Sequence, residues 1–314
     1  MKRLGLSLLI IFLVVAIITP IVAAEQVEVG LVVMSTSSEY WLAVKAGAEK
    51  ALEEVGGKLI YTGPATTAEV GKQVEAVENL INRQVDGIIV TPLDSDALVP
   101  PAKQAIAAGI PYISVDSGIN WDGVTSTIST DNVEGGRIAM QTLSALLDYR
   151  GKVAIVNALA GIPSNDERNT GAVEIANKYD EIKLLPIQRG KDQAAAMANT
   201  ENILIANPDL TGIFAGFDRG AIGAARALKN RGLTGKIKFV AFDANPEEIE
   251  LLKEGTIDAL IVQQPFEMGR LAVEFILKTR AGEKVPQQVN TPVVVVTKEN
   301  MNDPVVKKVL APTE

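Results

Sequence analysis

The sequence predicts an α/β protein made of two similar lobes, each a doubly wound parallel sheet with helices on both faces, in three layers. Short runs rich in Val and Ile alternate with longer amphipathic stretches along most of the chain. Most of these runs are apolar throughout, which is typical of strands that are buried on both faces. The chain has 314 residues, more than one hydrophobic core usually holds, so two sheets are expected.

The first half begins with a buried strand over residues 27–33 and a helix over 40–55, which Gly56 and Gly57 end. The same alternation then predicts a strand over 58–61, a helix over 67–84, a strand over 86–91, a helix over 96–108 and a strand over 111–115. Pro100 and Pro101 fall inside the third helix. If Pro100 is the first residue of that helix, the residues before it form a loop turn.

A second run of the same kind begins at Asp131. It predicts helices over 132–149, 166–178 and 193–207 and strands over 152–157, 182–187 and 212–215, and the pattern continues through 221–231, 237–242, 246–253 and 257–262. Strands that are each followed by a helix indicate parallel sheets, and the two runs supply one sheet each.

The first residues have the pattern of a secretory signal peptide. Lys2 and Arg3 precede an apolar run over 8–18, and small residues follow before Glu25, so cleavage is expected after Ala24. The alternative is a retained membrane anchor, but the apolar run is shorter than the roughly 20 residues that a spanning helix needs. The chain has no Cys, so we expect neither a lipid anchor nor disulfides, and predict a freely diffusing periplasmic protein.

Composition excludes several classes of function. A formal net charge of −8 makes nucleic acid an unfavourable partner, because the chain would repel phosphates. The chain has no His and no Cys, which excludes Ser/His and Cys/His nucleophile pairs and the usual zinc sites. No GxGxxG motif or Walker lysine follows a predicted strand, so no nucleotide cofactor is expected.

Polar residues recur where the predicted strands end. Open α/β sheets bind ligands at the carboxyl ends of their strands, so these residues are the candidates for a binding site. They are residues 35–41, Asp116 with Ser117, residues 158–168, Phe217 with Asp218, Asp243, and Gln263 with Gln264.

These residue types suit a polyhydroxylated ligand such as a sugar, which has apolar faces and a polar rim. Tyr40 or Trp41 could pack against a sugar face, although adjacent helical residues point in different directions and either could pack at the helix start instead. Asp116 and Asp243 would accept hydrogen bonds from hydroxyls, and Gln263 would both donate and accept. Asp243 also precedes Pro246 by three residues, so a helix N-cap or turn is an alternative role.

Several short phrases, in their order along the chain, resemble the type I periplasmic sugar-binding proteins of the ribose-binding family. They are Gly30-Leu31-Val32-Val33, Tyr40-Trp41 with Lys45-Ala46-Gly47-Ala48, Gln84-Val85-Asp86-Gly87-Ile88 with Asp94-Ser95-Asp96-Ala97, Ala108-Gly109-Ile110-Pro111, Ser129-Thr130-Asp131-Asn132 with Gly135-Gly136-Arg137, Asn207-Pro208-Asp209-Leu210, Val240-Ala241-Phe242-Asp243, and Gln264-Pro265 with Met268-Gly269. The resemblance covers almost all of the chain after the signal.

The resemblance implies a hinge of three chain crossings, near Thr130-Asp131, Gln263-Gln264 and Pro292-Val293. The signal peptide would then be 1–24, the N-terminal lobe 25–130 plus 264–292, and the C-terminal lobe 131–263 plus 293–314. It also implies that a sugar or related polyol closes the lobes and is delivered to the transmembrane permease of an ATP-binding-cassette importer. A chemoreceptor is a further partner that the resemblance leaves open.

The resemblance also places ligand contacts at individual positions. Asp116 and Asp243 match sugar contacts, and Ser38 matches a ligand-binding Asn. Asp166 lies opposite a ligand-binding Arg and Arg168 opposite a second Arg, so which of the two reaches the cleft is open, and Asp166 could simply cap a helix.

Other positions depart from the pattern of ribose binders. Ser117 stands where ribose binders have an Arg, Lys191 stands near the usual second aromatic, and Phe217 replaces an Asn. Phe217 could supply that second apolar plate or pack in the core. These departures argue against ribose itself as the ligand.

Three rival functions follow from the same residues. Asp116 and Asp243 could form a glycosidase pair. A ligand-regulated repressor would need a helix-turn-helix before the first strand, where this chain has its signal. A binder of an autoinducer-type signal molecule would use the same two lobes and differ only in its downstream partner.

Overall fold

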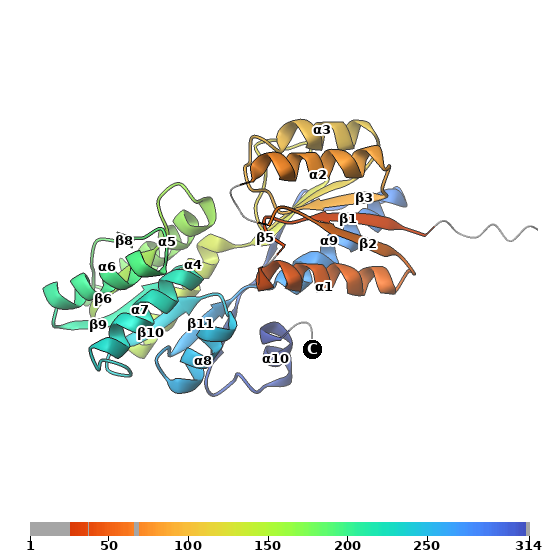
Figure 1. Ribbon diagram of the computed structural model, residues 1–314. Helices are drawn as coiled ribbons and strands as arrows, with labels where there is room; N and C mark the ends of the chain where they lie inside the picture. Colours follow the sequence, from red (N-terminus) through yellow and green to blue (C-terminus); the bar gives the residue numbers. More distant parts are fainter. Residues whose placement is uncertain (1–25, 37, 66–68, 312–314) are drawn as a thin grey trace, which may run out of the picture.

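The computed structural model describes residues 26–36, 38–65 and 69–311, which form two α/β lobes side by side (Figure 1). The first lobe has a six-stranded parallel sheet with the strand order β12-β5-β4-β3-β1-β2. Its elements are β1 (Glu28–Val32), α1 (Glu39–Glu53), β2 (Lys58–Thr62), α2 (Val70–Asn82), β3 (Gly87–Val90), α3 (Val99–Ala107), β4 (Tyr112–Val115), β5 (Ser126–Thr130), α9 (Pro265–Arg280) and β12 (Gln288–Thr291).

The second lobe repeats this plan with the strand order β13-β11-β10-β9-β6-β7, and β8 pairs with β6. Its strands are parallel except β13, which pairs antiparallel with β11. Its elements are α4 (Asn132–Leu146), β6 (Gly151–Asn157), α5 (Pro163–Ala176), β7 (Ile182–Leu184), β8 (Gln188–Arg189), α6 (Gln193–Ala206), β9 (Leu210–Ala215), α7 (Asp218–Asn230), β10 (Lys238–Phe242), α8 (Pro246–Glu254), β11 (Ala259–Val262), β13 (Val294–Thr297) and α10 (Pro304–Leu310).

Each sheet lies between two apolar clusters, which makes each lobe a three-layer structure. In the first lobe, α1 and α9 cover one face and α2 and α3 cover the other (Figure 1). In the second lobe, α4 and α5 cover one face and α6, α7 and α8 cover the other. The strands are buried on both faces, which is why their sequences are almost continuously apolar.

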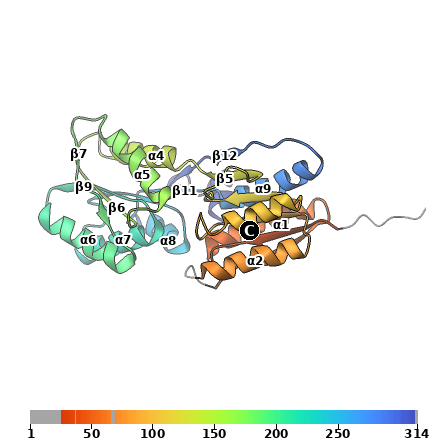
Figure 2. The ribbon, with the colours of Figure 1, turned by 90° about the horizontal axis from the view of Figure 1, so that it is seen from above.

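The chain passes between the two sheets at three places among the described residues: from β5 to α4, from β11 to α9 and from β12 to β13 (Figure 2). Thr130 ends β5 and Asn132 begins α4, so the first crossing is very short. The second crossing consists of Gln263 and Gln264. Both therefore place polar residues directly between the lobes.

The fold class predicted from the sequence is confirmed, and several element boundaries differ. Helix α3 begins at Val99, with Pro100 and Pro101 in its first turn. Helix α5 begins at Pro163 rather than at Asp166, because a proline is well suited to the first turn of a helix. Strand β5 and the elements after residue 262 were not predicted.

The predicted signal peptide and its cleavage site lie outside the described residues. In the part of the chain that the structure describes, no helix combines the length and apolarity needed to cross a bilayer.

Candidate functional site

Asp116 and Asp243 occupy equivalent places in the two lobes. Asp116 directly follows β4 and Asp243 directly follows β10, and each of these strands is the third from the sheet edge that β12 or β13 forms. Their φ angles are 70° and 81°, in the left-handed region that non-glycine residues rarely adopt. Their backbone N–H groups donate to Ile128 O (2.8 Å) and Ile261 O (3.0 Å) of the neighbouring strands. Each lobe thus holds one carboxylate, in a strained backbone, at the carboxyl edge of its sheet.

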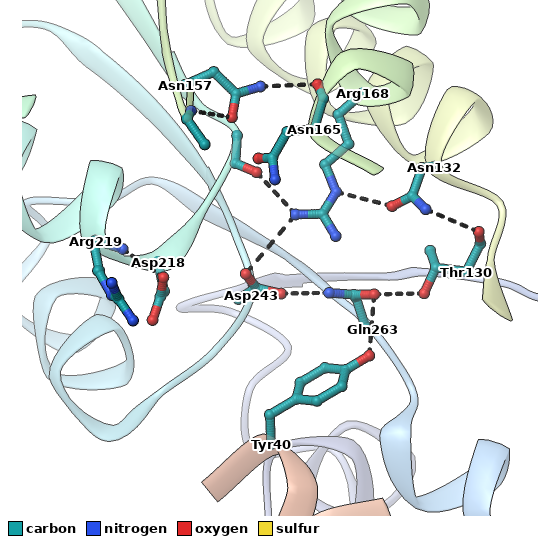
Figure 3. A network of polar contacts seen from close by, with 12 residues as sticks. Tyr40, Thr130, Asn132, Asn157, Asn165, Arg168, Asp218, Arg219, Asp243 and Gln263 are labelled. Carbon is teal, nitrogen blue, oxygen red and sulfur yellow. Dashed lines mark hydrogen bonds and ion pairs between the residues drawn. The ribbon is translucent and has the colours of Figure 1, made fainter. Parts of the chain in front are cut away.

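A chain of hydrogen bonds joins these two carboxylates through the second crossing. Figure 3 shows the part of this chain from Tyr40 through Gln263 to Asp243. The Tyr40 hydroxyl lies 2.8 Å from Asp116 Oδ1 and 3.2 Å from Gln263 Oε1. Gln263 Nε2 donates to Asp243 Oδ1 at 2.6 Å, and Thr130 Oγ1 donates to Gln263 Oε1 at 2.6 Å. A tyrosine hydroxyl has one proton, so Tyr40 donates to only one of its two neighbours at a time.

Arg168 extends this network within the second lobe. Its Nε donates to Asn132 Oδ1 (2.9 Å) and its Nη1 donates to Gly216 O (2.9 Å). Nη1 also lies 3.9 Å from Asp243 Oδ2, and the guanidinium carbon lies 3.7 Å from the centre of the Phe242 ring. Arg168 is 5% exposed, so its charge is accommodated by these partners rather than by solvent.

Asp166 is used locally. Its Oδ2 accepts from Gly161 N (2.7 Å) and its Oδ1 forms an ion pair with Arg189 Nη1 (2.9 Å). The hydrogen bond from Gly161 and the positive charge of Arg189 lower the pKa of the Asp166 carboxyl. The sequence did not decide whether Asp166 or Arg168 reaches the cleft. In the structure, Arg168 points towards Asp243 and Asp166 points towards the loop after β6.

The two central carboxylates have raised pKa values. Burial is the main cause for both, because it disfavours the charged form. At Asp116 the hydrogen bond from Tyr40 opposes the rise, and at Asp243 the charge of Arg168 opposes it while Asp218 adds to it. Half-buried carboxylates of this kind gain from additional hydrogen-bond donors, which ligand hydroxyls would supply.

The other predicted residues lie around this network. The Trp41 ring is 8% exposed in the core of the first lobe and packs edge-on against Tyr40, with centroids 4.7 Å apart. Ser38 is the N-cap residue of α1 but its side chain makes no capping bond. The Phe217 ring is half-buried and covers Gly220 of its own helix. Ser117 Oγ donates to Asp116 Oδ2 at 3.3 Å.

A cavity of about 620 Å³ lies between the lobes beside Asp116. Ser117 and Trp121 line it from the first lobe, and Asn132 and Pro163 line it from the second. Its volume is within the range of small-molecule sites. Residues from both lobes thus meet around one space.

Sequence reasoning did not identify Thr130 and Asn132 as site residues. Thr130 bonds to Gln263, and Asn132 bonds to Arg168 with its Oδ1 and to Thr130 O with its Nδ2 (3.2 Å). The signal was present, because both residues flank the predicted first crossing, where side chains from the two lobes have to meet.

Residues 29–284 match the family described as the periplasmic binding protein domain. The chain belongs to this family. Membership of this family makes the protein a binding protein and not an enzyme, and the interpretation of Asp116 and Asp243 as a glycosidase pair has no support.

This periplasmic binding protein is similar to several characterised relatives. The ribose import binding protein of Bacillus subtilis is 28% identical, over 88% of each chain. A solute-binding protein of Agrobacterium vitis, solved with bound D-fucose, is 34% identical with a TM-score of 0.79, over 90% of this chain and 99% of that chain. A second A. vitis solute-binding protein, bound to α-D-tagatopyranose, is 31% identical with a TM-score of 0.81, over 91% and 99% of the two chains.

A further carboxyl, Glu248, lies buried in helix α8 of this periplasmic binding protein. Glu248 forms a capping box with Asn245, in which Oε2 accepts from Asn245 N (2.9 Å). The residue is 0% exposed, and its Oε1 has no hydrogen-bond partner within the described residues. Burial and the negative charge of Asp243 raise the pKa of Glu248 well above its ordinary value.

Glu248→Gln is expected to stabilise the protein increasingly as the pH rises. When folding raises the pKa of a carboxyl, the folded protein loses stability as the pH increases from the unfolded pKa towards the folded pKa. The amide of Gln does not titrate, so the variant avoids this loss. Near pH 4 wild type and variant should have similar free energies of unfolding, and near pH 7.5 the variant should be more stable. Urea unfolding at both pH values measures the difference. Glu250→Gln, at an exposed residue of the same helix, is the control for the loss of one negative charge, and an equal gain in both variants would contradict the role of burial.

Proposed function

We propose that this protein captures a sugar or a related polyol between its two lobes and delivers it to the permease of an ATP-binding-cassette importer. The observation that carries the proposal is the pair of half-buried carboxylates, Asp116 and Asp243, contributed by opposite lobes and joined through Tyr40 and Gln263. Carboxylate, amide, phenol and guanidinium groups in one place supply the acceptors and donors that several neighbouring hydroxyls need.

The names of the relatives support a sugar as the ligand. They include a ribose import binding protein and a D-allose-binding periplasmic protein, and the solved structures carry D-fucose, α-D-tagatopyranose and D-arabinose. Because these sugars differ in ring size and hydroxyl stereochemistry, we assign the class of ligand and leave its identity to experiment.

We propose that ligand capture is a closure of the lobes about the three crossings. The proposed lobes are 25–130 with 264–292 and 131–263 with 293–314, after removal of 1–24 and release into the periplasm. Ligand contacts from both lobes would favour the closed form, and the permease would distinguish it from the open form.

The contact residues that we propose come from both lobes. Asp116, Ser117, Tyr40, Arg168, Asp243 and Gln263 already surround the junction. Ser38 and Phe217 lie further out, and we propose that lobe closure brings them to the ligand. For Trp41, which packs against Tyr40, and for Asp166, which pairs with Arg189, we propose indirect roles in positioning the contact residues.

The proposal is tested by thermal unfolding of the chain from Glu25 onwards with D-ribose, D-allose, D-tagatose, D-fucose and D-arabinose. A ligand that binds only the folded state stabilises it by about 2.7 kcal/mol at 100 times its Kd. We expect at least one of these sugars to raise Tm in a concentration-dependent way, and small-angle scattering to report a more compact molecule with it. If none of the five sugars changes Tm at millimolar concentration, the proposal is wrong.

A further inference from the structure

Helix α5 turns a polar stripe towards the site. Its first two turns bury Asn165, Arg168 and Asn169, which are 8%, 5% and 4% exposed. Its later turns bury only small or apolar residues, including Ala172 and Ile175, against the core of the second lobe. Residues three and four apart share one face of a helix, so all these buried residues form one continuous face of α5. The polar stripe is the part of this face nearest the crossings, and the rest of the face is apolar.

The members of this stripe differ in how their polar atoms are satisfied. Arg168 is held by Asn132 and Gly216 O, and Asn169 Oδ1 accepts from Asn157 Nδ2 at 2.7 Å. The backbone oxygen of Asn165 also accepts from Asn157 Nδ2 (3.1 Å). Its Oδ1 is inaccessible to solvent and has no partner among the described residues.

Asn169 Nδ2 is likewise buried and unpartnered there, but Asn157 already fixes the Asn169 amide. A buried amide oxygen without a donor is costly, so such an atom in a folded protein calls for an explanation. Asn165 Oδ1 is therefore the hydrogen-bond acceptor of the stripe that lacks a donor among the described residues.

The position of Asn165 supplies that explanation. Figure 3 places its side chain beside the Arg168 guanidinium, on the way from Asn157 to Asp243. Its neighbours Pro163, Ser164 and Glu167 line the cavity between the lobes. The amide therefore lies next to the Arg168–Asp243 pair, at the end of α5 that borders the cavity.

We propose that Asn165 is a further ligand-binding residue that determines specificity, and that its Oδ1 accepts a hydrogen bond from one hydroxyl of the bound sugar. This inference rests on the proposed function. Asp243 and Asn165 are then two acceptors with the Arg168 donor between them, which matches two neighbouring hydroxyls of a sugar ring. A sugar that lacks one of these hydroxyls would leave a buried acceptor unpaired and would be rejected.

The test compares Asn165→Ala with wild type in calorimetric titrations. The probes are whichever of D-ribose, D-allose, D-tagatose, D-fucose and D-arabinose binds wild type most tightly, together with its monodeoxy analogues. We expect Asn165→Ala to weaken binding of the parent sugar about tenfold, which corresponds to one hydrogen bond. For one deoxy analogue, wild type and variant should bind equally, because the hydroxyl that Asn165 would contact is absent.

Two further variants separate ligand contact from a structural role. Asn165→Asp keeps an acceptor oxygen and should retain more of the preference for the parent sugar over that analogue than Ala does. Thr170→Ala changes an exposed residue of the same helix and should bind every probe like wild type. A uniform loss of affinity for all probes in Asn165→Ala would identify a structural effect and overturn the inference.

Wild-type affinities for every probe in Asn165→Ala would also overturn the inference, while leaving the proposed function intact. Wild-type protein that binds none of the sugars would instead overturn the proposed function and, with it, the role of Asn165. The two failures are thus distinguishable in one set of titrations.

Discussion

Replacing Asp116 or Asp243 by Asn is expected to weaken sugar binding roughly 10- to 100-fold while stabilising the ligand-free protein. The loss of affinity follows because hydrogen bonds to a charged acceptor contribute about 1.5–3 kcal/mol each. The gain in stability follows because burial raises the pKa of both carboxyls, so the folded chain bears a cost for their negative charge at neutral pH.

Asn is also a good fit to both sites. It keeps an oxygen that can accept from Tyr40 at position 116 or from Gln263 at position 243. It also tolerates the φ angles of 70° and 81° that these positions require. We expect Tm of the ligand-free variants to rise by about 2 °C or more, which corresponds to ~1 kcal/mol in a chain of this size.

The pH dependence of this effect has a definite sign. Both variants should gain stability over wild type as pH rises from the unfolded Asp pKa towards the raised folded pKa, and the gain should then level off. Thermal unfolding between pH 4 and 8, with and without sugar, measures both effects.

Asp258→Asn is the matched control, because Asp258 accepts from Phe239 N (2.8 Å) near the opposite end of β10 from Asp243. It should leave the sugar response intact. If Asp116→Asn and Asp243→Asn both bind sugar like wild type, the two carboxylates do not form the binding site.

The fold could be predicted from the sequence because the buried strands of a parallel sheet are continuously apolar. The strand that was missed shows the limit of this signal. In β5 (Ser126–Thr130) buried and partly exposed residues alternate and most are polar, because it lies near the edge of the sheet and leads into a crossing. Hydrophobic runs therefore identify the centre of each sheet better than the strands that connect the lobes.

The centre of the site could be predicted for a related reason. Asp116, Asp243 and Gln263 each follow a strand, and the carboxyl ends of parallel strands share one edge. The choice between Asp166 and Arg168 could not be made, because it depends on where α5 begins and how the helix is rotated. The helix starts at Pro163 and buries the face of Arg168, which also carries Asn165.

The aromatic pair illustrates the same limit. Tyr40 and Trp41 are adjacent, so only one can face the junction between the lobes, and composition cannot tell which. The structure directs the Tyr40 hydroxyl to Asp116 and Gln263 and covers Trp41 with the core. Adjacent helical residues diverge by about 100°, so this choice needs the three-dimensional packing of α1.

Gly136→Ala is expected to destabilise the second lobe by about 3 kcal/mol and to weaken sugar binding with it. Helices α4 and α5 cross at Gly136 and Gly171, and a Cβ atom at residue 136 would lie 2.0 Å from the carbonyl oxygen of Arg168. A backbone atom cannot move aside as a flexible side chain can, so α5 would have to shift. That shift would displace Arg168 from Asn132 and Gly216 O, and therefore from Asp243.

Urea unfolding and sugar titration of the same samples test both parts of this expectation. Gly71→Ala is the matched control, because Gly71 is an exposed residue of α2 with no atom within 4 Å of an added Cβ. There the substitution should stabilise the protein by about 0.5–1 kcal/mol, since Ala restricts the unfolded chain, and sugar affinity should not change. A Gly136→Ala protein as stable as wild type would mean that α4 and α5 are farther apart than this packing requires. Full stability loss with unchanged sugar affinity would mean that Arg168 does not depend on the helix crossing for its position.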